Sequence, residues 1–261
     1  MKNTPREVAE KTALVTSTFY NPDSKIDRNR AEIATRTIKS AHDFGYKLVV
    51  IDGGSYDEFL RAIEGYGSLF QENPRGMGSG RRQGIREGLK FEVPVVAWTE
   101  VEKESYIREA WKTAVSILED RADLVYPARP SLNDYPTSQQ HAEKFGNSVL
   151  MHLTGARLDY WFGPKTWKRD ISNYFLNYPP ENRIFELGKR KINLEDKWDS
   201  LHLPVLDIIK AGKRVISIPV NYEHPKAQTA DEETDVEMDL KRLEQLQNLV
   251  PASVAYWRKN S

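Results

Sequence analysis

The stretch Lys47–Asp52, KLVVID, followed by Gly53, Gly54 and Ser55, decides how this chain folds. Its unbroken apolar run is typical of a buried strand, and the two glycines and the serine end that strand in a turn. A helical segment is expected next, at residues 56–66. A strand, a turn and a helix in this order begin a βαβ unit, so the sequence predicts an α/β protein.

The same alternation continues on either side of this segment. Residues 12–19 (TALVTSTF) form an apolar run that ends at the turn formers Asn21-Pro22-Asp23. Between residues 28 and 44 apolar side chains recur at helical spacing, and Gly45 follows as a C-cap. Further strands are expected at 68–71, 93–98 and 123–126, with a long helix over 104–119. This order predicts a mostly parallel central sheet flanked by helices.

The second half of the chain is less regular. Helices are expected near 138–153 and 201–211, an aromatic segment at 160–167, and a late strand at 214–219. An amphipathic helix over 235–249 follows, and we expect its apolar residues to pack against the body of the protein: Met238, Leu240, Leu243, Leu246 and Leu249. No repeat or low-complexity linker divides the chain, so residues 1–261 are expected to form a single domain.

Composition narrows the classes of function. The 261 residues include 38 basic and 38 acidic side chains, and the 39% hydrophobic content is enough for a folded core. Balanced charge argues against a nucleic-acid-binding protein, and a chain without cysteine has no disulfide, thiolate chemistry or Cys-ligated zinc. No window has the roughly 20 apolar residues of a membrane span, and no secretion signal is evident. We therefore expect a soluble, cytoplasmic protein.

Polar residues follow the first two predicted strands, where ligands of open α/β sheets bind. Thr18 and Asn21 lie at the end of the first strand, and Asp52 and Gly54 at the end of the second. The Asp52 carboxylate could accept hydrogen bonds from a nucleotide base or ribose, and the glycine lets a ligand approach the backbone. A helix N-cap and an ordinary turn would explain the same residues.

The run at residues 76–84, GMGSGRRQG, is the second candidate site. Glycines alternate with other residues at Gly76 and Gly78, and Arg81 and Arg82 follow before a predicted helix start. Backbone N–H groups at a helix N-terminus attract phosphate, and arginine adds bidentate contacts. The run matches neither the P-loop nor the dinucleotide fingerprint. A flexible surface loop is the alternative.

The third candidate is a divalent-cation site. Glu100 and Glu102 lie two positions apart on an extended segment, so their carboxylates share one face and could hold Mg²⁺ or Mn²⁺. His224, after the late strand, lies where a loop returns to the same sheet edge. Neutralisation by Lys103, or an acidic helix N-terminus for the two glutamates and a simply packed histidine, would also explain these residues.

In this order the segments resemble the nucleotide-sugar-dependent glycosyltransferases of the GT-A fold, family-2-like, and among them the enzymes that make glucosyl-3-phosphoglycerate and mannosylglycerate. The resemblance spans residues 13–225. Residues 50–57 resemble the family's Asp-x-Gly-Ser-x-Asp, and residues 100–102 take the place of its Asp-x-Asp metal motif. Both aspartates of that motif are glutamates here, which is the main departure from the family.

The resemblance implies a Rossmann-related GT-A domain with a nucleotide-binding half, about 1–130, and an acceptor half, about 131–261. It implies a nucleotide-diphosphate-sugar donor, a small hydroxyl acceptor, and Mg²⁺ or Mn²⁺ as cofactor. Asp199 would act at the acceptor as a general base, and Glu100, Glu102 and His224 would hold the metal. The residues expected to bind the donor are Thr18, Asn21, Asp52, Gly54, Gly76, Gly78, Arg81 and Arg82.

Two other functions stay open on the sequence. A sugar-nucleotide nucleotidyltransferase can share a related sheet, although the segment after the first strand has no glycine at residues 16–23. A non-catalytic nucleotide-binding module of the same fold also stays possible, because both aspartates of the metal motif are replaced by glutamate. No nucleic-acid partner is expected, homo-oligomers are possible, and the stereochemistry of transfer is not decided.

Overall fold

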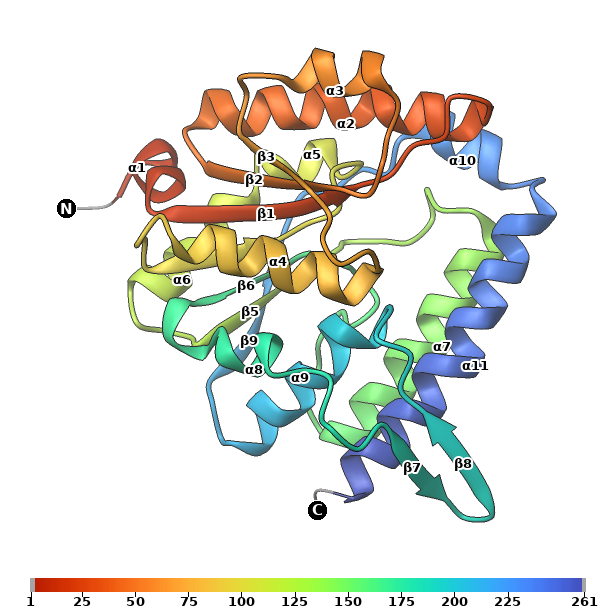
Figure 1. Ribbon diagram of the computed structural model, residues 1–261. Coiled ribbons are helices and arrows are strands. Elements are labelled where there is room, and N and C mark those ends of the chain that lie inside the picture. Colours follow the sequence, from red (N-terminus) through yellow and green to blue (C-terminus); the bar gives the residue numbers. More distant parts are fainter. Residues whose placement is uncertain (1–2, 260–261) are drawn as a thin grey trace.

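One seven-stranded sheet with helices on both faces organises the computed structural model, which describes residues 3–259 (Figure 1). The strand order is β3-β2-β1-β4-β6-β5-β9. The seven strands are β1 Thr12–Thr18, β2 Lys47–Asp52, β3 Ser68–Gln71, β4 Val95–Trp98, β5 Leu124–Ala128, β6 Lys165–Lys168 and β9 Val215–Pro219. All pairings are parallel except those of β6, which runs antiparallel between β4 and β5, so the mostly parallel sheet is confirmed.

Alternation along the central strands builds a core on each face of the sheet. Leu14 and Val50 face one core, which is closed by helices α2 (Lys25–Phe44), α3 (Asp57–Ile63) and α5 (Glu104–Ile107). Val15 and Ile51 face the other, which includes side chains from α4 (Met77–Leu89), α7 (Thr137–Thr154), α8 (Asn173–Leu176) and α9 (Asp199–Lys210). Because neighbouring residues of a strand point to opposite faces, one apolar run supplies both cores.

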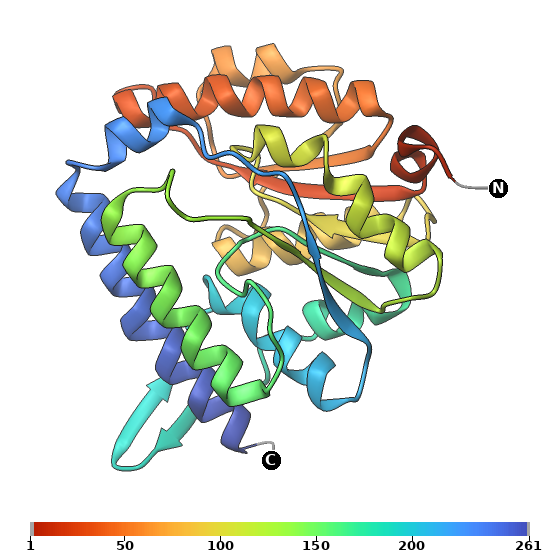
Figure 2. The same ribbon diagram turned by 180° about the vertical axis from the view of Figure 1, so that it is seen from behind.

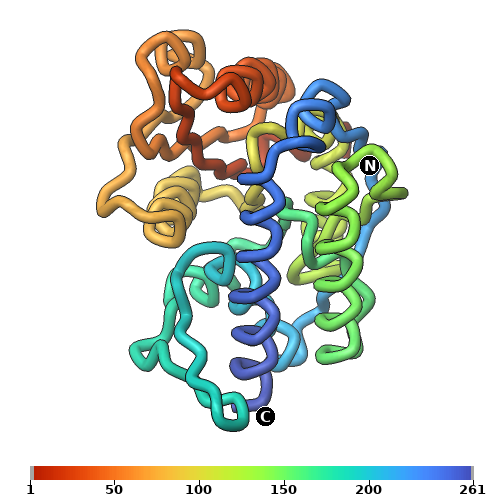
Figure 3. The backbone as a smooth tube through the Cα atoms, turned by 90° about the vertical axis from the view of Figure 1, so that its right-hand side faces the viewer, coloured from red at the N-terminus to blue at the C-terminus, as the bar shows by residue number. Residues whose placement is uncertain are grey.

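The remaining elements complete one side of the molecule. Helix α11 (Val236–Lys259) lies beside α7, with α10 (Lys226–Glu232) before it (Figures 2 and 3). A hairpin of β7 (Ile184–Leu187) and β8 (Arg190–Asn193) packs on α11. Helices α1 (Pro5–Glu10) and α6 (Ala110–Leu118) lie at the other end. Within residues 3–259, no helix is both long and apolar enough to span a bilayer.

Several sequence-based expectations need correction. The helix expected over 104–119 is divided into α5 and α6, and α11 runs on to Lys259. Leu249 of α11 is buried, but Leu240 and Leu243 are about half exposed, at 53% and 51% of their area, so that stripe packs only in part. Strand β6, the hairpin and α10 were not expected, because these short segments carry no clear hydrophobic period.

The glycine run is helical, which is the largest difference from the expected loop. Helix α4 begins at Met77, and its residues Gly80, Gly84 and Gly88 are four apart and therefore share one face. A Cβ at Gly84 would lie 2.5 Å from Val15 Cγ1 and 3.1 Å from Ile51 Cγ1. Gly84 and Gly88 let the helix backbone lie directly on the sheet, and Gly80 lies against the Glu72 side chain.

We therefore expect Gly84→Ala to destabilise the protein by about 1–3 kcal/mol, because the added methyl overpacks the contact between α4 and β1. Urea unfolding monitored by circular dichroism measures the change. Arg86→Ala, on the exposed face of the same helix, is the control and should stay within about 0.5 kcal/mol of wild type. Equal stability of Gly84→Ala and wild type would contradict this account of the packing.

Candidate functional site

A cavity of about 620 Å³ opens at the carboxyl ends of β1, β2 and β4. One wall consists of residues at the ends of these strands or just after them: Ser17, Thr18, Phe19, Tyr20, Gly53, Glu100, Glu102 and Lys103. The opposite wall comes from α7, α10 and α11 and includes Gln139, Glu143, Gln228, Glu232, Lys241 and Arg242. The whole cavity is lined by seven arginine and lysine side chains and by five glutamates, so it has an excess of two positive charges.

The structure divides the predicted site residues into two groups. Those that line the cavity are Thr18, Arg81, Glu100, Glu102 and His224. Those that do not line it are Asn21, Asp52, Gly54, Gly76, Gly78, Arg82 and Asp199. Segments far apart in the sequence do meet here, but several of the expected ligand contacts are replaced by contacts within the protein.

Asp52 is fully buried and organises the turn after β2. Its carboxylate accepts hydrogen bonds from the Thr18 hydroxyl (2.9 Å), from the backbone N–H of Gly54 (2.8 Å) and from that of Ser55 (3.0 Å). Gln71 adds a fourth donor at 3.3 Å. In this structure Asp52 therefore stabilises an ordinary turn. Gly53 is the residue of this turn that lines the cavity.

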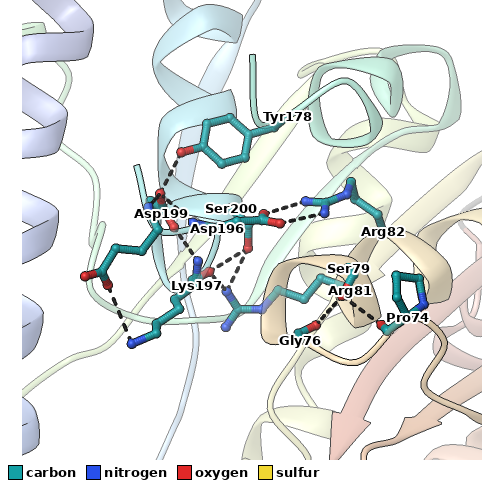
Figure 4. A network of polar contacts seen from close by, with 11 residues as sticks. Pro74, Gly76, Ser79, Arg81, Arg82, Tyr178, Asp196, Lys197, Asp199 and Ser200 are labelled. Atoms are coloured by element: carbon teal, nitrogen blue, oxygen red, sulfur yellow. Dashed lines mark hydrogen bonds and ion pairs between the residues drawn. The ribbon is translucent and has the colours of Figure 1, made fainter. Parts of the chain in front are cut away.

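The N-terminus of α4 is covered by the loop before α9, as Figure 4 shows. The N–H of Gly78 donates to the carbonyl of Asp196 (2.9 Å), and Arg82 makes two bonds to the Asp196 carboxylate, of 2.6 and 2.7 Å. Arg81 donates to the Lys197 carbonyl (2.6 Å) and to Ser200 (3.0 Å). The expected phosphate position at Gly76 and Gly78 is therefore taken by Asp196.

Asp199, the expected general base, holds this same loop in place. Its carboxylate accepts from the backbone N–H groups of residues 195, 196 and 197 and from the Tyr178 hydroxyl (2.7 Å) (Figure 4). The side chain is buried and lies outside the cavity. With four donors on two oxygens, the geometry gives Asp199 a structural role, which corrects the expected catalytic one.

Glu102 is paired with a residue that the sequence did not single out. Its Oε1 lies 3.0 Å from Nη2 of Arg30, on α2, and accepts a hydrogen bond from the Tyr20 hydroxyl (2.9 Å). Burial opposes the charged carboxylate, but Arg30 and Tyr20 outweigh it and hold the pKa of Glu102 below its usual value. Arg30 is 72 positions away in the sequence, so no local motif could reveal the pair.

His224 lies among aromatic rings and cations. It stacks on Tyr135 with ring centroids 4.1 Å apart, and its Nδ1 is 3.3 Å from the Tyr222 hydroxyl. Burial, with Lys103 and Arg242 nearby, lowers the pKa of His224 to about 2, so the ring is neutral at pH 7. Its Nε2 is buried and has no hydrogen-bond partner among residues 3–259.

A buried polar network that the sequence did not indicate forms the far wall. Arg129 makes two 2.8 Å bonds to Asp159 and contacts Glu143, while Gln139 donates to Glu143 (2.6 Å). Arg242 donates to Gln139 (2.6 Å) and lies 3.4 Å from Glu232. These charged groups already have partners within the network, which fixes α7, α10 and α11 relative to one another.

Comparison with known proteins gives a fold. No protein-family model and no curated protein matches the chain. A crystal structure of glucosyl-3-phosphoglycerate synthase from Mycobacterium tuberculosis with Mn²⁺, uridine diphosphate and phosphoglyceric acid matches with a TM-score of 0.61 at 11% identity, over 96% of this chain and 82% of that one. The same enzyme with Mn²⁺, uridine-diphosphate-glucose and phosphoglyceric acid gives 0.62 at 10%, over 96% and 84%.

The chain has the GT-A glycosyltransferase fold. At 10–11% identity the likeness extends to the fold alone. A third structure of the same mycobacterial enzyme, with Mg²⁺ and uridine diphosphate, agrees with a TM-score of 0.56 at 12% identity, over 96% of this chain and 83% of that one. The expected fold is therefore confirmed.

The side chains of this GT-A protein do not fit the expected metal. In the part of the chain that the structure describes, no three histidine, aspartate or glutamate side chains are grouped so that they could hold a metal ion. Arg30 takes up the Glu102 oxygen, and the cations beside His224 repel a second positive charge. The Mg²⁺ or Mn²⁺ site predicted at Glu100, Glu102 and His224 is therefore not formed here.

Removing the Asp199 carboxylate tests its structural role. We expect Asp199→Ala to lower the free energy of unfolding by roughly 2–4 kcal/mol, because it leaves several buried donors without an acceptor. Urea titration gives the value, and Glu195→Ala in the same loop is the exposed control. Unchanged stability together with complete loss of activity would instead restore the catalytic interpretation.

Lys165, buried on β6, makes stability depend on pH. Burial lowers its pKa to about 7, while Glu100 and Asp159 favour its charge and Arg81 opposes it. Its unfolded pKa is about 10.4, so between pH 7 and 10 the unfolded chain binds more protons and stability rises with pH.

The contribution of Lys165 should reach at most about 1.4 kcal/mol per pH unit, and Lys165→Met should reduce the rise. Lys241, whose pKa burial lowers to about 8, contributes the part that remains. Urea unfolding at pH 7, 8 and 9 measures the rise. Lys168→Met is the control: hydrogen bonds to Asp120 and Asp123 raise the pKa of Lys168, so it contributes no rise in this range. A rise of the same size in Lys165→Met and in wild type would show that Lys165 does not contribute to it.

Proposed function

We propose that this protein is a glycosyltransferase that moves a sugar from a nucleotide-diphosphate sugar to a small hydroxyl acceptor. One observation carries the proposal: a cavity of about 620 Å³ lies at the carboxyl edge of a GT-A sheet and is lined from both halves of the chain. Ligand sites of 300–1,000 Å³ are typical, and open α/β sheets bind ligands at this edge. The mycobacterial enzyme of the same fold was crystallised with uridine-diphosphate-glucose.

The charge of the cavity suits the leaving group. Breaking the bond between the sugar and the diphosphate places negative charge on the departing phosphate, which fixed positive groups stabilise. Arg30, Lys103 and Lys241 line the cavity and supply such charge. Asp199 is not the base of this reaction, because its carboxylate is bound within the protein.

The far wall favours a polyol or sugar acceptor. Amide and carboxylate side chains of Gln139, Glu143 and Gln228 line it, and these groups exchange hydrogen bonds with hydroxyls. Trp161 and Trp198 add flat apolar surface on the same cavity. The acceptor in this proposal is therefore a small molecule with several hydroxyl groups.

Ligand-induced stabilisation tests the proposal. The melting temperature should rise with one class of nucleoside diphosphate and its sugar conjugates, and not with the matching nucleosides. Binding at a hundred times Kd stabilises a protein by about 2.7 kcal/mol. Release of nucleoside diphosphate from the preferred nucleotide sugar, measured by chromatography, then reports transfer or hydrolysis.

The alternatives give different results in the same assays. Pyrophosphate release from a nucleoside triphosphate and a sugar phosphate would support a nucleotidyltransferase instead. Binding without release or transfer from any nucleotide sugar would support a non-catalytic module. Absence of binding to every nucleotide would overturn the proposal.

A further inference from the structure

The protein carries its own cations where a donor diphosphate would bind. Resting on the function proposed above, we propose that Arg30, Lys103 and Lys241 together bind the diphosphate of the donor in place of a divalent metal. We call these three side chains the cationic triad. All three line the cavity, and Arg30 and Lys241 both interact electrostatically with Glu102.

Arg30 keeps donors available for a ligand. Its Nη2 is 3.0 Å from Glu102, its Nη1 is 4.0 Å from Asp27, and its Nε is buried without a partner among residues 3–259. A guanidinium has five N–H groups, so one close ion pair leaves most of them unused. Its planar fork matches phosphate oxygens in a bidentate contact.

Lys103 is held by aromatic faces, and the opposite charge that attracts it, on Glu100, lies beyond ion-pair distance. Its Nζ lies 5.5, 5.6 and 5.4 Å from the ring centroids of Tyr135, Phe162 and Tyr222. No carboxylate of residues 3–259 lies within ion-pair distance of it or of Lys241. Rings position an ammonium without using its N–H donors, which stay free for an anion.

The other buried cations of the cavity are already occupied. Arg129 is bound to Asp159 and Glu143, Arg242 to Gln139 and Glu232, and Arg81 to the backbone of Lys197. Lys103 and Lys241 are thus cations of the cavity without an ion-pair partner among residues 3–259, and Arg30 has one close ion pair, with Glu102. The position of the triad beside Glu102 is where the glycosyltransferase resemblance places a metal.

A metal at Glu102 would compete with Arg30. Both need the same carboxylate, and a divalent ion there would stand against a guanidinium 3.0 Å from the carboxylate oxygen. His224 adds an unpartnered Nε2 on the same cavity, which suits a phosphate oxygen when it carries the proton. The geometry therefore favours an anion over a cation at this point.

Binding with and without metal tests the inference. Inorganic pyrophosphate, UDP, GDP, ADP and CDP are titrated calorimetrically into the full chain, once in EDTA and once in Mn²⁺. We expect pyrophosphate and the preferred nucleoside diphosphate to bind in EDTA at least as tightly as in Mn²⁺, because Mn²⁺ complexes a diphosphate in solution and competes with the triad for it.

Variants separate the triad from a metal site. Arg30→Met should weaken binding about tenfold to a hundredfold in both buffers, Lys103→Met should weaken it similarly, and Arg30→Lys should fall between Arg30→Met and wild type. Arg36→Met, on the exposed side of the same helix and paired with Glu104, is the matched control and should bind as wild type. Glu102→Gln should bind at least as tightly as wild type, since it removes a competing anion.

A double variant that removes both charges of the Arg30–Glu102 pair is the control for misfolding. Arg30→Met leaves Glu102 buried without a partner, whereas Arg30→Met combined with Glu102→Gln does not, and the double variant should fold and bind as weakly as Arg30→Met. Binding that requires Mn²⁺ and is lost in Glu102→Gln or His224→Ala would overturn the inference and leave the proposed function standing. Absence of binding in both buffers would overturn the proposed function itself.

Discussion

Parallel pairing of β1 with both β2 and β4 is the constraint on which the site depends. Because the three strands run in one direction, their carboxyl ends lie at one edge of the sheet, and residues 17–20, 53 and 100–103 meet there although they span more than eighty positions. Helix α4 can lie close beneath that edge only because Gly84 and Gly88 bring its backbone onto β1. The glycines thus act through packing, and the cavity is a consequence of the strand order.

The far wall is made of buried charges, and its energetics indicate why it persists. Arg129, Asp159 and Glu143 lose hydration that their mutual bonds only partly replace, so apolar side chains of similar volume would stabilise the fold at least as well. What the network provides is position: it fixes the polar groups of α7, α10 and α11 that face the cavity. A wall of apolar side chains would hold no polar groups in fixed positions to form hydrogen bonds with a ligand.

The sequence predicted the elements that one hydrophobic period defines. Strands β1 and β2 and helices α2 and α7 lie within a few residues of the expected bounds, because each has a clear apolar pattern. Prediction from the sequence was wrong where contacts between distant segments determine the structure. The Asp199 carboxylate binds the backbone N–H groups just before it, and Asp196 covers the start of α4. Strand β6 lies antiparallel between β4 and β5. The close packing of α4 through Gly84 and Gly88 was not expected, because a phosphate loop has a similar glycine content.

The replacement of both aspartates by glutamate in the acidic motif takes on a physical meaning once Arg30 is seen. Glutamate is one methylene longer than aspartate, so the carboxylate of Glu102 extends further from β4 toward α2 and the Tyr20 hydroxyl. A metal site needs carboxylate oxygens that are free to coordinate, whereas Arg30 takes up the Glu102 oxygen in an ion pair. The glutamate at position 102 and its ion pair with Arg30 therefore belong together. With the Glu102 charge neutralised by Arg30, the remaining charge of the cavity is positive and attracts an anion instead of a metal ion.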